Sequence, residues 1–211
     1  MNYENALGIE FRETRDVVHN GGEARCVSGT REYPTDIDDL WDAVTNPERI
    51  PRWFLPISGD LQPRGRYQLE GHAGGDIIEC DPPHRFYATW EYGGDVSWIT
   101  VTLKAGAAGT TLTLEHIMPR DEKNEEHWGK YGPAATGVGW ELAFLALDYI
   151  LANPGAVIDA KENEAWMTSA AGKAFMRDSA RQWGDAHIAA GKDPDAARAM
   201  ADHTAGFYTG E

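Results

Sequence analysis

The stretch "GPAATGVGWELAFLALDYILANPG", residues 132–155, decides the fold that the sequence predicts. Asn153-Pro154-Gly155 ends its helical pattern, because proline does not continue a helix and glycine suits the cap. About five turns of apolar helix after a run of strands indicate an α+β domain, in which the helix lies across a curved sheet. The apolar face follows the spacing i, i+4, i+7 and i+11 and consists of Trp140, Phe144, Leu147 and Leu151.

Five strand candidates precede this helix, and turn residues separate them. Alternation is clear in several: Leu112, Leu114 and His116 share one face, and polar residues occupy the opposite positions. This pattern is typical of an antiparallel sheet that is wet on one side and covered on the other. The candidates are residues 64–71, 74–81, 84–92, 95–105 and 109–118.

A hairpin and a short helix come before these strands. "HNGG", residues 19–22, is an Asn-Gly turn between two strand-like runs, which brings the sheet to about six or seven strands. "TDIDDLWDAVTNPE", residues 35–48, predicts a helix that Thr35 or Asp36 caps and that ends at Asn46-Pro47.

The last part of the chain, residues 155–211, differs from the rest. It is rich in alanine, with helical patterns at about 161–190 and 194–206. We therefore divide the chain into a domain over residues 1–154 and a helical C-terminal extension, packed on that domain or on a partner subunit. The extension is a lid over a cavity mouth, a cover on the outer face of the sheet, or a dimer arm. One stripe of its first helix carries Phe175, Trp183 and Ala186.

Composition bounds the class of protein. A chain of 211 residues is long enough for one domain with a sizeable core and short for two. The net charge of −15 repels phosphate backbones and anionic lipid, so we expect neither nucleic-acid nor membrane binding. No apolar run approaches the ~20 residues of a membrane span.

Cysteine usage and the first residues bear on the compartment. Cys26 and Cys80 lie far apart without a C-x-x-C pair, so we expect free thiols in a reducing cytoplasm, with a disulfide as the alternative. The start "MNYENALGIEF" lacks a basic segment followed by an apolar one, so we expect no signal peptide.

Several motifs occur in an order that resembles one protein family. "LWDAVTNPERIPRWF" is followed by "GGDIIECDPPHRFYATWEY", then "GTTLTLEHIMP", then "GVGWELAFLALDYIL". This order is similar to the START-like, birch-pollen-allergen-like (Bet v) superfamily, SRPBCC, and within it to the bacterial branch named after the activator of Hsp-90 ATPase. The resemblance covers about residues 24–153. It rests on Trp41, Ala43, Thr45, Asn46, Pro47, Trp53, Phe54, Ile78, Cys80, Pro82, Pro83, Trp90, Leu112, Thr113, Leu114, His116, Gly139 and Trp140.

The resemblance implies a helix-grip fold, in which a curved antiparallel sheet wraps around a long helix. Residues 155–211 lie outside this core pattern. The resemblance also implies a cavity between sheet and helix for small apolar or aromatic molecules. Some relatives are cyclases or hydratases of polyketides, some carry lipids or hormones, and some act through protein partners, so the fold alone does not give the activity.

Patterns for catalysis and metal binding are scarce. No H-E-x-x-H, G-x-S-x-G, P-loop or G-x-G-x-x-G occurs, so we expect neither a metal nor a cofactor. The weak catalytic candidate is His116, which alternation turns toward the concave side, where an imidazole can act as acid or base near neutral pH. The alternative is a core histidine with its hydrogen bonds satisfied. Glu115 is expected to face outward, so the two residues form no dyad.

Aromatic side chains are the candidates for a ligand pocket, because small-ligand sites are mostly apolar with few polar groups. The proline-broken stretch "NPERIPRWFLP", residues 46–56, makes a natural pocket mouth. Arg52 could supply a polar contact there, or be solvated or paired with a carboxylate. The alternative is that the aromatic residues close the core without leaving space. The candidate ligand-binding set is Trp53, Phe54, Tyr67, Trp90, His116, Trp140 and Phe144.

Two further tryptophans receive other roles. Trp41 is expected to pack its helix against the sheet. Trp98 is out of phase with Ile99 and Val101, so we expect it on the outer face of the sheet, against the extension or a partner subunit.

Three functions follow from these observations. The first is a cytoplasmic protein that binds a small apolar or aromatic molecule in its cavity, non-catalytic or of unknown activity. The second is a cyclase-, aromatase- or hydratase-like enzyme that uses His116. The third is an interaction protein, either a homodimer or the partner of a small regulatory protein in a toxin–antitoxin-like gene pair.

Overall fold

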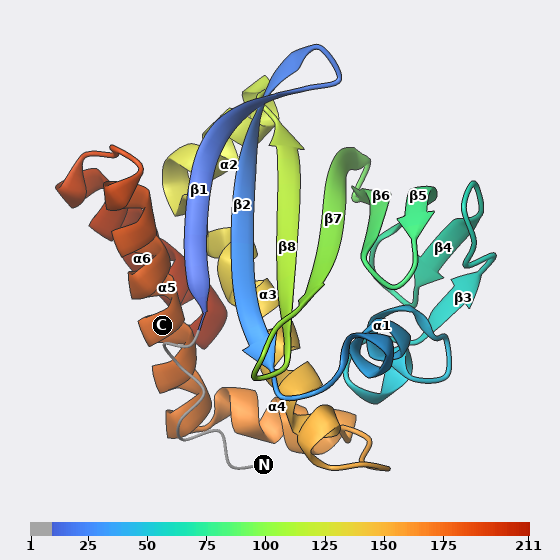
Figure 1. Cartoon of the computed structure of the whole chain (residues 1–211). Helices are drawn as coiled ribbons and strands as arrows, with labels where there is room; N and C mark the ends of the chain where they lie inside the picture. Colours follow the sequence, from blue (N-terminus) through green and yellow to red (C-terminus); the bar gives the residue numbers. More distant parts are fainter. Residues whose placement is uncertain (1–9) are drawn as a thin grey trace.

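The computed structural model describes residues 10–211, and its core is one eight-stranded antiparallel sheet (Figure 1). The strand order is β1-β2-β8-β7-β6-β5-β4-β3. The strand missing from the prediction is β3, which has three residues and is too short to show alternation. The strands are β1 Phe11–His19, β2 Gly22–Tyr33, β3 Ile57–Gly59, β4 Arg66–Leu69, β5 Gly74–Asp81, β6 Arg85–Tyr92, β7 Asp95–Ala105 and β8 Thr110–Pro119.

Residues 1–9 lie outside the described part of the chain. The expectation about a signal peptide and the first residues of the predicted hairpin fall on them, so both stay predictions.

The predicted hairpin forms around Asn20-Gly21. These two residues have φ values of 50° and 80°, and two positive φ values are what a two-residue type I′ turn requires, which is why Asn-Gly favours it. The turn sets a register that places Thr14 opposite Val27. Val27 then packs on the helix side of the sheet.

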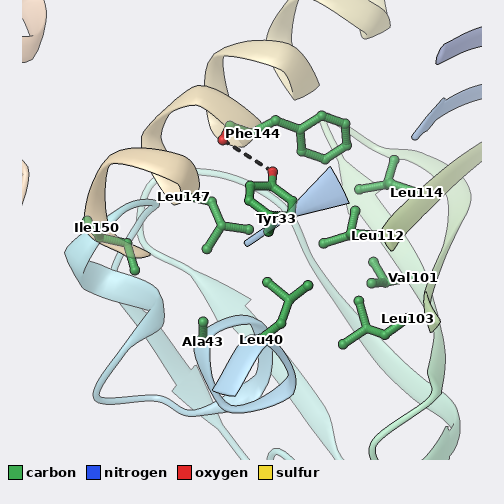
Figure 2. Close-up of a cluster of buried hydrophobic side chains, with 10 residues drawn as sticks. All are labelled: Tyr33, Leu40, Ala43, Val101, Leu103, Leu112, Leu114, Phe144, Leu147 and Ile150. Carbon is green, nitrogen blue, oxygen red and sulfur yellow. Dashed lines mark hydrogen bonds between the residues drawn. The ribbon is translucent and has the colours of Figure 1, made fainter. Parts of the chain in front are cut away.

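The long helix is α3, Ala134–Ala152, and it lies across the concave face of the sheet, as predicted (Figure 1). Figure 2 shows Phe144 and Leu147 of α3 in one cluster with Leu112 and Leu114 of β8. The hydroxyl of Tyr33 donates to the carbonyl of Phe144 at 3.2 Å and ties β2 to the helix. By length and composition α3 is apolar enough to cross a membrane, although no run that long was expected; half of it is buried inside the structure as a core helix.

Two shorter helices flank the sheet and α3. The predicted helix α1, Ile37–Thr45, is capped by Asp36 rather than Thr35, because the Asp36 carboxylate accepts from the amide of Asp39 at 2.8 Å. The helix α2, Glu122–Tyr131, was not predicted, because it is polar along its length and none of its residues is buried.

The C-terminal part of the chain forms α4 Ala160–Thr168, α5 Ala170–Ala189 and α6 Pro194–Thr209. The helix predicted over 161–190 is interrupted at Ser169, whose hydroxyl accepts from the amide of Gly172 at 3.2 Å and begins α5. A serine hydroxyl that caps the start of a new helix gives the backbone an alternative to one continuous helix. The alanine-rich pattern did not reveal this break.

The helix α5 packs on the side of α3 that faces away from the cavity. Phe175 and Trp183 cluster with Val138 and Leu145 of α3. The helices come close at Gly137, where a Cβ atom would lie 2.1 Å from Cε2 of Trp183. The helix α5 is therefore not on the outer face of the sheet, and none of the residues 155–211 lines the cavity.

Buried ions join the edge of the sheet to these helices. Arg12 of β1 donates to Glu141 of α3 at 2.9 Å and to Gln182 of α5 at 2.6 Å. Arg31 of β2 donates to Glu10 at 2.8 Å, and these side chains are almost fully buried. Buried charges are tolerated when they are paired in this way.

The outer face of the sheet carries Trp98, as predicted, but the hairpin covers it. The ring of His19 lies 4.4 Å from the Trp98 ring, and His19 Nε2 lies 2.9 Å from the hydroxyl of Tyr87. Of the two neighbours expected for Trp98, the extension is wrong, because its helix α5 packs on α3, at the opposite face, and the partner subunit stays a prediction.

Candidate functional site

A cavity of about 150 Å³ lies between α3 and strands β4 to β8, and it is partly open to solvent. The short helix η1, Ile50–Arg52, and the residues after it form one of its walls. Among the described residues that line the cavity, none is an aspartate, glutamate, lysine, arginine or histidine. An apolar space of this kind holds a molecule through shape and burial of apolar surface.

The structure brings six of the seven candidate ligand-binding residues together around this cavity. The seventh, His116, is not among the lining residues. The lining candidates come from four separate segments of the chain, and their role as ligand contacts stays a prediction. They are Trp53, Phe54, Tyr67, Trp90, Trp140 and Phe144.

The mouth segment, residues 46–56, is held against α1. Asn46 ends α1, and its side-chain oxygen accepts from the amide of Glu48 at 2.8 Å. Arg49 then reaches back to Asp39 at 2.6 Å and to Asp42 at 3.0 Å. The Asn-Pro step and these ion pairs together turn the chain, so that the residues after η1 face the cavity.

A row of rings connects the mouth segment to α3. The rings of Trp53 and Phe54 stack at 5.4 Å, and those of Phe54 and Trp140 stack at 6.2 Å. The ring of Trp90 meets Trp140 edge-on at 5.1 Å. Aromatic pairs at these distances and angles attract each other beyond the area they bury.

Three of the aromatic wall residues have their side-chain polar atoms hydrogen-bonded within the protein. The indole nitrogen of Trp53 donates to the carbonyl of Ala43 at 3.0 Å, and that of Trp140 donates to Nδ1 of His116 at 3.1 Å. The hydroxyl of Tyr67 donates to the carbonyl of Thr89 at 2.7 Å, and burial raises its pKa. The rings of Trp53, Tyr67 and Trp140 therefore offer a ligand their faces and edges rather than hydrogen-bond donors.

His116 is a buried histidine with both ring nitrogens engaged. Nδ1 accepts from Trp140, and Nε2 lies 2.8 Å from the hydroxyl of Ser97. Burial lowers the pKa of His116 to about 4, so the imidazole is neutral at physiological pH. Its neighbour Glu115 faces outward and pairs with Arg15, which confirms that the two residues form no dyad.

Two other expectations near the mouth have different outcomes. Trp41 packs on the ring of Phe86 at 6.3 Å, which confirms its place between helix and sheet. Arg52 is half-buried, and its Nε donates to the carbonyl of Ala156 at 2.9 Å rather than to a carboxylate. The amide of Ile158 donates to the carbonyl of Arg52 at 2.9 Å, so the segment after α3 is tied to the mouth.

Sequence reasoning missed the contribution of β5 to the cavity. Ile77 and Cys80 line it, whereas Ile78 is exposed. A β-bulge between Ile77 and Glu79 breaks the alternation, so that two successive residues face outward. A strict period of two cannot reveal such a bulge.

Metal and thiol chemistry is limited in the described part of the chain. Within residues 10–211, no three histidine, cysteine, aspartate or glutamate side chains are grouped as metal ligands. Cys26 and Cys80 are both free, as expected.

Known proteins share this arrangement. The sequence profile of the family described as Activator of Hsp90 ATPase homolog 1-like protein matches residues 34–152. The chain belongs to this family. The match runs from the end of β2 to the end of α3, and all six lining candidates fall within it. The resemblance to the START-like, Bet v-like SRPBCC superfamily is thereby confirmed.

Solved structures extend the likeness. The crystal structure of CalU16 from Micromonospora echinospora has a TM-score of 0.64 and 30% identity, over 87% of this chain and 98% of CalU16. DynU16, from the dynemicin biosynthetic locus, has a TM-score of 0.52 and 25% identity, over 61% of this chain and 47% of DynU16. No curated protein is a significant match.

The CalU16 match reaches well beyond the part that the family profile covers. The profile leaves out β1, β2 and the helices α4 to α6, whereas the match to CalU16 covers most of the chain. Members of the SRPBCC superfamily bind small hydrophobic ligands.

Proposed function

We propose that the protein binds a small, uncharged apolar or aromatic molecule in the cavity between α3 and the sheet, and that it does so without catalysis. The observation that carries the proposal is the lining, which has no acidic, basic or histidine side chain among the described residues. Placing an ionised ligand beside such a wall would cost several kcal/mol, because no counter-charge compensates its lost hydration.

The volume of the cavity supports a ligand of modest size. A volume of about 150 Å³ equals that of engineered apolar cavities that take up benzene. The partly open side leaves room for a second ring. We therefore infer a ligand with one or two aromatic rings, or an aliphatic molecule of similar bulk.

A cyclase-like enzyme is the second candidate, and the similarity to DynU16 from the dynemicin biosynthetic locus favours it. The lining residues with a titratable group are Tyr67 and Cys80, and burial raises both of their pKa values. Neither group ionises readily near neutral pH, so general acid–base catalysis in the cavity would lack a suitable residue. Binding without catalysis is therefore the better supported function.

Two further proposals concern the C-terminal extension and the location of the protein. We propose that residues 155–211 are an extension of the same domain, which the contacts of Phe175 and Trp183 with α3 support. We also propose a cytoplasmic location, which the two free thiols support.

The test compares a neutral and an anionic ligand of one shape. Isothermal titration calorimetry at pH 7 would measure the affinity for 2-naphthol and for 2-naphthoate. We expect 2-naphthol to bind with a negative heat-capacity change, the mark of apolar burial, and 2-naphthoate to bind at least about tenfold more weakly, a difference of about 1.4 kcal/mol. Equal affinities, or no binding of 2-naphthol, would contradict the proposed function.

A further inference from the structure

A chain of hydrogen bonds lies behind the cavity wall and joins four elements. The indole nitrogen of Trp140 on α3 donates to Nδ1 of His116 on β8 at 3.1 Å. Nε2 of His116 lies 2.8 Å from the hydroxyl of Ser97 on β7. That hydroxyl donates to the carbonyl of Trp90 on β6 at 3.0 Å. The two tryptophans at the ends of this chain both line the cavity.

The protons of this chain have one consistent arrangement. An indole nitrogen only donates, so Nδ1 of His116 must carry the lone pair. A neutral imidazole then has its proton on Nε2 and donates it to Ser97. Ser97 in turn gives its own proton to the Trp90 carbonyl, so every donor in the chain has an acceptor.

This arrangement bears on the orientation of Trp140. The His116 ring meets the rings of both Trp90 and Trp140 edge-on at 5.9 Å, so it fills the space behind them. If the indole of Trp140 turned, its N–H would lose a buried acceptor, and a buried donor without a partner is costly. The ring of Phe54 stacks on Trp140 from the mouth side, so a turn of the indole would also disturb the mouth.

We propose that His116 is a positioning residue for the cavity, which holds the indole of Trp140 in the orientation that forms the wall. Ser97 selects the tautomer that allows this. His116 touches no ligand in this role and acts through Trp140. The consequence for affinity rests on the proposed function, whereas the hold on the indole does not.

The first experiment needs no ligand and no variant at His116. Nitrogen-15 NMR of the wild-type protein at pH 7 would show the protonation of both imidazole nitrogens. The assignment of the Trp140 indole resonance would come from the Trp140→Phe variant. We expect a neutral His116 with its proton on Nε2, and a Trp140 indole proton shifted downfield and slow to exchange. A charged ring or a proton on Nδ1 would overturn the proposal.

The second experiment compares the His116→Phe and His116→Asn variants. Phenylalanine fills the space without an acceptor, whereas the amide oxygen of asparagine can take the place of Nδ1. We expect the Trp140 indole proton to move upfield and exchange faster in H116F, and less so in H116N. If one indole in ten keeps the wall orientation in H116F, the affinity for 2-naphthol falls about tenfold.

A double-mutant cycle separates positioning from a general structural role. In the Trp140→Phe background the ring has no N–H to hold, so H116F should change the affinity for 2-naphthol less than twofold. A tenfold loss that persists in this background would show that His116 does not act through Trp140, and would overturn the proposal. If 2-naphthol does not bind the wild type, the proposed function fails, while the indole resonances still decide the role of His116.

Discussion

At the scale of single residues, the cavity exists where lining side chains are too small to fill the space between α3 and the sheet. Ala88 of β6 lines it and is buried, and the neighbouring wall positions carry larger groups such as Ile99 and Phe86. Ala43 of α1 is equally buried but is not a lining residue, and it packs against Leu40 and Leu147 (Figure 2). The two alanines therefore differ in the space before them, although their burial is the same.

This difference predicts opposite outcomes for one substitution. Ala88→Leu places a larger side chain in the cavity, so we expect the free energy of unfolding to stay within about 1 kcal/mol of wild type, and the binding of 2-naphthol to be lost. Ala43→Leu, the matched control, overpacks a filled cluster and should cost about 1–3 kcal/mol. Urea denaturation measures both. An equal loss in the two variants would argue against space beside Ala88.

His116 makes stability depend on pH. Burial lowers its pKa from 6.5 to about 4, so between these values the unfolded chain binds a proton that the folded protein does not. The stabilisation is complete above pH 6.5 and is lost as pH falls toward 4, by on the order of 3 kcal/mol. The H116F variant lacks this titration. The free energy of unfolding of wild type minus that of H116F should therefore fall from pH 7 to pH 4. If the two free energies changed with pH in parallel, the assignment would be contradicted.

At the scale of elements, α3 serves two neighbours at once. One side of it carries Phe144 and Leu147 toward the sheet and the cavity, and the other carries Val138 and Leu145 toward α5. A helix covered on two sides is apolar around most of its circumference, which explains why its composition is that of a membrane span. Gly137 is the point where α5 comes closest.

Two glycine substitutions test this contact. Gly137→Ala puts a Cβ atom 2.1 Å from the Trp183 ring, so α5 or the ring must shift, at a cost of about 1–3 kcal/mol. Gly129→Ala in α2 has no heavy atom within 4 Å of its added Cβ, so it should stabilise by about 0.5–1 kcal/mol through the better helix propensity of alanine. Thermal unfolding of both variants is the measurement. A stabilising G137A would mean that the two helices lie farther apart.

At the scale of the whole molecule, the sheet is shared by two kinds of interior. The half formed by β4 to β8 faces the cavity, and the edge formed by β1 and β2 faces α3 and α5 through buried ions. The buried ions connect the extension to the rest of the domain, because Arg12 contacts both Glu141 of α3 and Gln182 of α5. In the half formed by β4 to β8, none of the described residues that line the cavity has an acidic, basic or histidine side chain.

Much of this architecture follows from local pattern. The Asn20-Gly21 turn, the alternation of β8 and the helical spacing of α3 each predicted an element correctly, because each depends on neighbours in the chain. β3 and α2 were missed, because one is three residues long and the other is polar all round. The β5 bulge was missed because a single extra residue leaves no trace in composition.

The sequence by itself determined the fold class and the aromatic residues of the cavity wall. Periodicity and aromatic content are properties of the chain, and they do not depend on its tertiary contacts. Only the tertiary structure decided that His116 stands behind the wall rather than in it, that Cys80 lines the cavity and that the extension covers α3. These facts depend on which segments, distant in the sequence, come into contact. The free energy of such a contact depends on the side chains of both segments.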